Sequence, residues 1–142
     1  MANIRHQLQV QAPAEAVFVN LTTQNGLAGW WTPDVNAKAE VGSILRFGFG
    51  PSYFKEMKVM KLGPEKKVEW KCIVGAEEWI GTTIQFTLEK ADAKTIVHFS
   101  HDNWESLTPM FSQCSYDWAM FLRSLKHLCE KGKGFPFPDQ HQ

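Results

Sequence analysis

Two histidines occupy positions where general acid–base chemistry could take place. His6 and His101 each fall on the apolar face of an alternating segment, so both rings are expected to point inward. Because imidazole titrates near neutral pH, such a ring can orient or protonate a ligand carbonyl. The alternative is a hydrogen-bonded histidine of the core. A metal site is not expected, because His98 and His101 face opposite sides of one strand and no third ligand has a metal-binding spacing.

Aromatic side chains are abundant, with 6 Trp, 10 Phe and 2 Tyr in the chain. Most fall on the inward side of the expected elements, where they either fill the core or line a pocket for an apolar ligand. So many rigid and bulky rings favour a pocket that the side chains do not fill completely. The residues predicted to line it are His6, Trp30, Phe47, Phe49, Met57, Trp70, Trp79, Phe99, His101, Trp104, Phe111, Cys114, Trp118 and Phe121.

The tryptophan pair Trp30 and Trp31 allows two interpretations. Two consecutive tryptophans are not expected to face the same interior, so one of them is predicted at the rim of the pocket. There it would either gate a ligand or cap the sheet. Glu56 and Glu78 are the carboxylates expected nearest the mouth, unless both belong to the solvated surface.

The cysteines indicate no disulfide framework. Cys72, Cys114 and Cys129 form no close pair and no metal-ligand spacing, which is typical of reduced thiols in the cytoplasm. Cys72 and Cys114 are expected inside, where a thiol usually behaves as a small hydrophobe. Catalytic use would need an adjacent base.

Composition narrows the class of protein. The 142 residues include 15 basic and 15 acidic side chains, and this balance argues against a nucleic-acid partner. The start of the chain has no apolar leader region, and no apolar run has the length of a membrane helix, so a cytoplasmic protein without membrane insertion is expected. No cofactor motif is present.

The periodicity of the sequence then sets the elements that must position these side chains. Apolar residues at spacings of three and four predict a long helix over 109–131, and shorter patterns predict helical segments over 14–21 and 27–31. Period-two alternation predicts strands over 4–11, 43–50, 53–62, 67–74, 79–88 and 95–101. Consecutive alternating strands with short turns favour an antiparallel meander with one solvated face.

One α+β domain covering residues 1–142 follows from this order. A curved six-stranded antiparallel sheet wraps around the long C-terminal helix, with two short helices after the first strand. Six strands span roughly 25–30 Å and one helix about 10 Å, so the space between them holds either a large packed core or a cavity.

The chain also resembles helix-grip domains of the START and birch-pollen-allergen type. The resemblance rests on the segment from Val10 to Phe18, on Trp30, Trp31 and Pro33, and on later positions in the same order. The later positions include Trp70, Trp79, Gly81, His101, Trp104, Trp118 and Phe121. Within the superfamily it is most similar to the branch related to the C-terminal domain of the activator of heat-shock protein 90 ATPase. This resemblance implies a hydrophobic cavity between sheet and long helix, in a superfamily of lipid carriers and polyketide cyclases, and it supplies no catalytic motif.

Three functions remain open at this stage. The first is binding of a small hydrophobic or aromatic molecule in the internal cavity. The second is a cyclase, dehydratase or hydrolase that uses acid–base residues in that cavity. The third, implied by the family name alone, is a co-chaperone that stimulates a heat-shock protein ATPase. The eukaryotic activator carries a further N-terminal domain, whereas this chain is expected to begin with the helix-grip unit, as a monomer or a homodimer.

Overall fold

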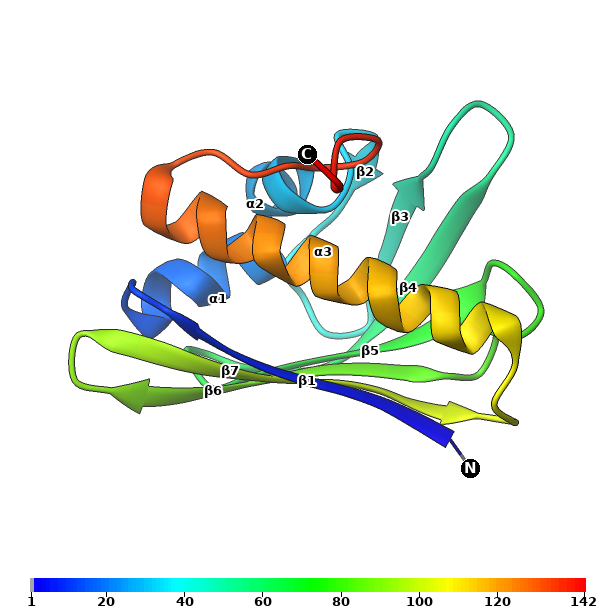
Figure 1. Cartoon of the computed structure of the whole chain (residues 1–142), viewed down its shortest axis with the longest axis horizontal. Helices are drawn as coiled ribbons and strands as arrows, with labels where there is room; N and C mark the ends of the chain where they lie inside the picture. Colours follow the sequence, from blue (N-terminus) through cyan, green and yellow to red (C-terminus); the bar gives the residue numbers. More distant parts are fainter. Residues whose placement is uncertain (1) are drawn as a thin grey trace.

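The computed structural model describes residues 2–142 as a curved antiparallel sheet whose concave side carries three helices (Figure 1). In chain order the elements are β1 (Ala2–Val10), α1 (Ala14–Thr22), α2 (Gln24–Trp30), β2 (Val35–Asn36), β3 (Ile44–Gly48), β4 (Phe54–Gly63), β5 (Lys67–Val74), β6 (Thr83–Ala91), β7 (Lys94–Trp104) and α3 (Pro109–Lys131). The predicted helix-grip architecture is therefore confirmed.

The sheet has seven strands, in the spatial order β1-β7-β6-β5-β4-β3-β2, with every neighbouring pair antiparallel. The prediction of six strands is wrong by one. The additional strand, β2, has two residues, and Val35 pairs with Phe47. Two residues are too few for an alternating pattern to reveal a strand.

Strand β6 begins at Thr83 rather than at Trp79. The segment before it turns, because Gly81 has a φ of 88° and the Thr82 N–H donates to the Trp79 carbonyl over 3.0 Å. Glycine adopts this left-handed backbone without the steric cost of a Cβ. The turn directs the indole of Trp79 toward the N-terminal part of α3, where it becomes part of the site described below.

Helix α3 crosses the concave face of the sheet (Figure 1). Its bounds match the predicted range of 109–131. The Thr108 hydroxyl accepts a hydrogen bond from the Phe111 N–H over 3.1 Å, Pro109 occupies the first turn, and Gly132 ends the helix with a φ of 81°. These are the usual start and stop signals of a helix.

The C-terminal segment after α3 folds back beside α2 (Figure 1). The Phe137 N–H donates to the Trp31 carbonyl over 2.7 Å, and the Phe135 N–H donates to the Ser124 hydroxyl over 2.6 Å. Gly134 lies against the carbonyl of Gly29, where an added Cβ would come within 2.3 Å of the oxygen. The tail is thus fixed to both α2 and α3.

Aromatic rings fill most of the space between the sheet and the helices. Trp31 is only 2% exposed, and its ring centroid lies 4.4 Å from that of Phe47 and 5.0 Å from that of Trp118. Trp30 is fully buried and stacks on Trp31 with an interplanar angle of 9°. The expectation that one of the two tryptophans lies at the rim is therefore wrong. Both are buried because their rings reach into the interior, where Trp30 packs against Phe86 of the sheet and Trp31 lies between Phe47 and Trp118.

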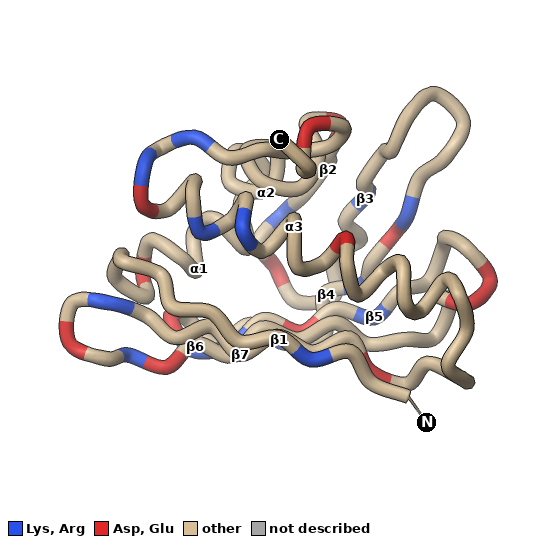
Figure 2. The backbone as a smooth tube through the Cα atoms, viewed as in Figure 1, with Lys and Arg blue, Asp and Glu red and all other residues tan. Residues whose placement is uncertain are grey.

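Charged residues of both signs are interspersed along the strands, helices and loops (Figure 2). The sequence carries 15 of each sign. None of the helices within residues 2–142 combines the length and the apolar character needed to cross a bilayer.

Candidate functional site

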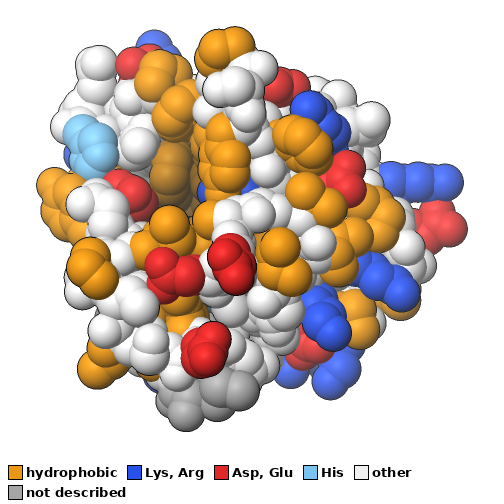
Figure 3. Space-filling model, turned by 90° about the vertical axis from the view of Figure 1, so that its right-hand side faces the viewer, with side chains coloured by type: hydrophobic (Ala, Val, Ile, Leu, Met, Phe, Trp, Pro, Cys, Tyr) orange, Lys and Arg blue, Asp and Glu red, His pale blue; other side chains and the backbone are white. Residues whose placement is uncertain are grey.

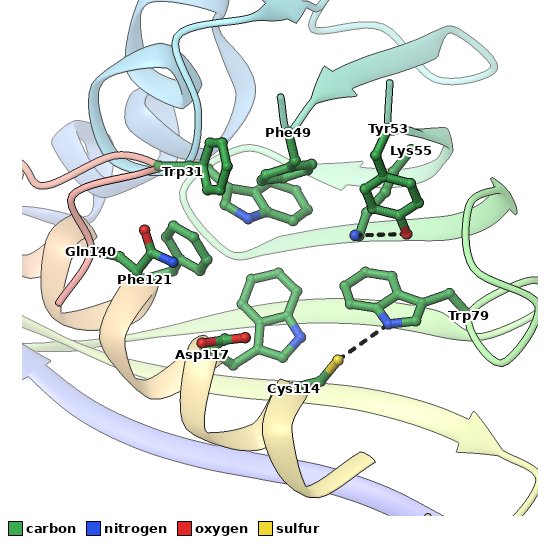
Figure 4. A pocket seen from close by; sticks show the side chains of 11 residues that line it. Trp31, Phe49, Tyr53, Lys55, Trp79, Cys114, Asp117, Phe121 and Gln140 are labelled. Carbon is green, nitrogen blue, oxygen red and sulfur yellow. Dashed lines mark hydrogen bonds between the residues drawn. The ribbon is translucent and has the colours of Figure 1, made fainter. Parts of the chain in front are cut away.

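A pocket of about 180 Å³ lies where the aromatic packing ends, between the β3–β4 hairpin, the N-terminal half of α3 and the C-terminal tail (Figure 4). The surface is visibly hollowed between hydrophobic side chains on the face shown in Figure 3. The residues that line the pocket are Trp31, Phe49, Tyr53, Lys55, Trp79, Cys114, Asp117, Trp118, Phe121, Phe137 and Gln140.

Seven of these eleven residues are aromatic, and they form continuous walls. Phe49 packs between Trp31 at 5.6 Å and Phe137 at 5.3 Å, measured between ring centroids. On the opposite side Trp79 and Trp118 stack at 6.2 Å with an interplanar angle of 25°. A site of this composition suits an apolar or aromatic ligand, with a few polar groups to orient it.

Lys55 is the cation of the pocket. The residue is only 9% exposed, and its Nζ lies 4.3 Å from the ring centroids of Tyr53 and Trp79 and 4.7 Å from that of Phe49. Aromatic faces stabilise a cation through their quadrupoles. Within residues 2–142 no carboxylate lies within 4.0 Å of Nζ.

The hydroxyl of Tyr53 links the cation to the turn after β5. It accepts hydrogen bonds from Lys55 Nζ over 3.1 Å and from the Ala76 N–H over 3.0 Å. Because a phenol oxygen has two lone pairs, both of its acceptor positions are used and its own proton is left to donate.

Asp117 and Gln140 lie on the other side of the pocket from Lys55 in the view of Figure 4. Gln140 is 9% exposed, and its Oε1 is buried without a hydrogen-bond partner among the described residues. The Arg123 guanidinium donates to the Gln140 carbonyl over 3.1 Å, and the carboxylate of Asp117 lies 3.6 Å from the ring of His141. These contacts hold the end of the tail against α3.

Cys114 contributes a thiol to the wall, but the thiol is not activated. Its Sγ accepts a hydrogen bond from Nε1 of Trp79 over 3.4 Å. Burial raises the pKa of Cys114 despite that hydrogen bond and the nearby charge of Lys55. Thiolates are the reactive form of cysteine, so a raised pKa argues against nucleophilic catalysis.

His101 is fully buried and lies behind the pocket wall rather than in the pocket. Its Nδ1 accepts from Nε1 of Trp118 over 3.0 Å, and its Nε2 lies 2.7 Å from the hydroxyl of Thr82. Burial lowers the pKa of His101 to about 3, and the charge of Lys55 acts in the same direction. A neutral ring with both nitrogens engaged is a core histidine and has no proton to exchange with a ligand.

His6 lies apart from His101. Its ring stacks on Phe99 with centroids 6.1 Å apart, and its Nε2 lies 3.1 Å from the Ser115 carbonyl of α3. The two histidines therefore do not face a common cavity, and the structure does not support acid–base catalysis by this pair.

No protein of curated function is a significant match to this chain. Residues 11–130 match the family described as Activator of Hsp90 ATPase homolog 1-like protein. The chain belongs to this family. Among solved structures, the Aha1 dimer from Colwellia psychrerythraea is 42% identical with a TM-score of 0.85, covering 94% of this chain and 100% of that one.

More distant structures share the fold of this family member. A protein from Staphylococcus saprophyticus is 17% identical with a TM-score of 0.79, and the match covers 94% of this chain and 95% of that one. CalU16 from Micromonospora echinospora is 16% identical with a TM-score of 0.74, covering 97% and 78% of the two chains. At this level of identity the likeness shows the helix-grip fold alone.

The predicted site residues of this family member fall into three places. Five of them line the pocket: Phe49, Trp79, Cys114, Trp118 and Phe121. Eight others lie in the packed interior or against it, outside the pocket: Trp30, Phe47, Met57, Trp70, Phe99, His101, Trp104 and Phe111. His6 lines a separate surface groove with Ala119 and Leu122.

Six lining residues were not predicted: Trp31, Tyr53, Lys55, Asp117, Phe137 and Gln140. For three of them a signal was present. Tyr53, directly before β4, and Lys55 on β4 occupy alternate positions with Met57 and so point to the same inward side. Asp117 is three residues from Cys114 on α3. Glu56 and Glu78 do not line the pocket, and Glu78 instead accepts a hydrogen bond from Thr108.

Proposed function

We propose that this family member binds a small aromatic or apolar molecule in the pocket between α3, the β3–β4 hairpin and the C-terminal tail. The observation that carries the proposal is a hollow of about 180 Å³ bounded by seven aromatic side chains. An engineered apolar cavity of about 150 Å³ is large enough to bind benzene. The pocket therefore suits a ligand built on one ring, or on two small ones.

The packing behind the pocket limits the length of the ligand. Trp31, Trp70 and Phe86 fill the space between the sheet and α2, with Trp31 and Trp70 stacked 6.0 Å apart. A long acyl chain would have to displace these buried rings, at a cost of several kcal/mol for each. We expect single-ring compounds to bind and long-chain fatty acids not to bind.

Ligand-detected NMR and thermal shift with a set of one-ring and two-ring aromatic compounds test the proposal. A ligand that binds only the folded state must raise the melting temperature. Cys114→Phe should fill the pocket and abolish binding, whereas Ser112→Phe, on the exposed side of the same helix, should leave binding unchanged. The absence of binding across the whole set, or equal binding to both variants, would contradict the proposal.

A second candidate function is contact with a chaperone of the Hsp90 class, because the family is described as activators of that ATPase. Exposed apolar side chains lie near the start of α3: Ile80 is 53% exposed, Leu107 78% and Met110 38%. Figure 3 shows the side of the molecule where α3 begins, on which acidic side chains lie between hydrophobic ones. Apolar patches with a polar surround are typical of protein contact sites.

Stimulation of the ATPase activity of a purified bacterial Hsp90 measures this second function directly. Leu107→Ser should reduce the stimulation if the face is used, and Val41→Ser, exposed on the loop before β3, is the matched control. The absence of stimulation by the wild-type chain would remove this candidate.

We also propose that the chain forms a homodimer, since the 42% identical Colwellia protein is a dimer. Sedimentation equilibrium over a range of protein concentrations tests this, and a single species of 16.2 kDa would contradict it.

A further inference from the structure

The charge of Lys55 has no counterion in the described chain, and this is unusual for a buried cation. An ammonium group has three N–H donors, and Lys55 places one of them on Tyr53. Nζ also lies over the aromatic rings of Phe49, Tyr53 and Trp79. Rings attract the charge but do not accept strong hydrogen bonds, so two donors remain for an oxygen that enters the pocket.

The positive field of Lys55 extends through the site. Burial raises the pKa of Cys72 to about 11, although the charge of Lys55 acts against the rise. Burial lowers the pKa of His101 to about 3, and there Lys55 reinforces the shift. The charge of Lys55 therefore acts on groups of both β5 and β7, and a ligand anion in the pocket would receive the same field as an attraction.

The other end of the pocket has the opposite chemistry. Asp117 carries a carboxylate and Gln140 an amide oxygen that is buried and unpaired. Neither lies within ion-pair or hydrogen-bond distance of Lys55, and Figure 4 shows the two ends separated by aromatic rings. The Asp117 carboxylate remains partly exposed, so it can accept a hydrogen bond from a donor group on a ligand.

We propose that the pocket selects small aromatic acids that carry a hydroxyl or amino group at the end of the ring opposite the acid. The anionic oxygen lies against Lys55 and the Tyr53 hydroxyl, the ring lies between the aromatic walls, and the distal donor reaches the carboxylate of Asp117. This inference rests on the proposed aromatic-binding function and adds the charge and polarity of the ligand.

The test compares two nearly isosteric probes, para-hydroxybenzoate and its neutral amide, para-hydroxybenzamide. Each is titrated into the wild-type chain by isothermal calorimetry near neutral pH. A charge-assisted hydrogen bond contributes about 1.5–3 kcal/mol, so the acid should bind at least about tenfold more tightly than the amide. Unsubstituted benzoate, which lacks the distal donor, should bind more weakly than para-hydroxybenzoate.

Variants assign the preference to Lys55. Lys55→Met keeps an unbranched side chain without the charged end and should abolish the preference for the acid. Lys55→Arg retains the charge and should preserve part of the preference. Lys58→Met is the matched control, because Lys58 is exposed on the outer face of the same strand. The comparison of the two probes on the wild-type chain needs no variant, so poor folding of Lys55→Met would not prevent the test.

The outcomes separate the two proposals. Tighter binding of the acid, lost in Lys55→Met and retained in Lys58→Met, supports the inference. Equal binding of acid and amide, or a preference that Lys55→Met retains, overturns the inference and leaves the aromatic pocket standing. Failure of the acid, the amide and neutral aromatic compounds to bind overturns both.

Discussion

The indole N–H of Trp118 donates to Nδ1 of His101 over 3.0 Å, and this contact fixes the protonation of the histidine. Since Nδ1 accepts, the proton of the neutral ring is on Nε2 and is donated to the Thr82 hydroxyl over 2.7 Å. The Thr82 hydroxyl in turn donates to the Trp79 carbonyl over 2.5 Å. The chain of hydrogen bonds runs in one direction and ties α3 to the turn that positions Trp79.

Removing the donor at the start of this chain should destabilise the fold. Trp118→Phe leaves a buried acceptor on His101 unpaired, whereas Trp104→Phe removes an N–H that has no partner within residues 2–142. Both substitutions delete the same ring volume from a buried tryptophan. In urea denaturation, Trp118→Phe should therefore lose about 1–3 kcal/mol more than Trp104→Phe. Equal losses would show that the hydrogen bond contributes nothing.

The depressed pKa of His101 should make the fold sensitive to mild acid. The pKa is about 3 in the folded chain and near 6.5 in the unfolded one, so below about pH 6.5 the unfolded state binds the extra proton. As the pH decreases below about 6.5, the free energy of unfolding therefore decreases too, by up to about 1.4 kcal/mol for each pH unit. This loss ends when the pH approaches the pKa of the folded state.

His101→Gln tests this dependence, because the amide accepts and donates but does not titrate. Denaturation curves between about pH 7 and about pH 4 should show a shallower loss of stability for the variant than for the wild type. Parallel losses in the two proteins would mean that other groups cause the acid sensitivity.

Most of the fold was predictable from the sequence, because its elements are regular. The bounds of β5 follow from apolar residues at every second position, and those of α3 from apolar residues spaced by three and four. The short strand β2 and the shifted start of β6 were not predictable, because they depend on pairing with β3 and on the backbone of Gly81. The pairing of β2 is a tertiary effect, whereas the turn at Gly81 is local but interrupts an alternation that continues on both sides of it.

The candidate site was predictable only in part. The sequence pattern correctly predicts that the side chains of aromatic residues such as Trp79 and Trp118 point inward. An inward side chain can either fill the core or line a pocket, and the pattern does not distinguish these two cases. Lys55 was overlooked because its charge suggested an outer face, although its alternation with Met57 indicated the inner one. Phe137 and Gln140 follow α3 in an irregular tail, whose course no periodic pattern predicts.

The tail should be needed to complete the pocket. In Gly134→Ala the new methyl group would lie 2.3 Å from the Gly29 carbonyl oxygen and 2.9 Å from the Ser124 hydroxyl, so the tail must move. We expect weaker binding of aromatic probes and faster proteolysis after Lys131. Gly63→Ala, whose added methyl meets neighbours at an ordinary 3.7 Å, is the control. Unchanged affinity in Gly134→Ala would show that Phe137 and Gln140 do not close the site.

Cys114 offers a direct report on occupancy of the pocket. Burial raises its pKa, and burial likewise raises the pKa of Cys129, so both thiols should alkylate more slowly than free cysteine at mildly alkaline pH. The two differ in place: Cys114 lines the pocket, whereas Cys129 accepts a hydrogen bond from Asn20 over 3.3 Å.

A bound aromatic compound should therefore protect Cys114 from iodoacetamide and leave the rate at Cys129 unchanged, as followed by mass spectrometry of peptides. Protection should increase with ligand concentration and reach half its maximum near the dissociation constant that calorimetry gives. Equal protection of both thiols would instead indicate general stabilisation of the fold. Full reactivity of Cys114 at saturating ligand would place the ligand elsewhere, since a molecule among these aromatic walls contacts the first turns of α3.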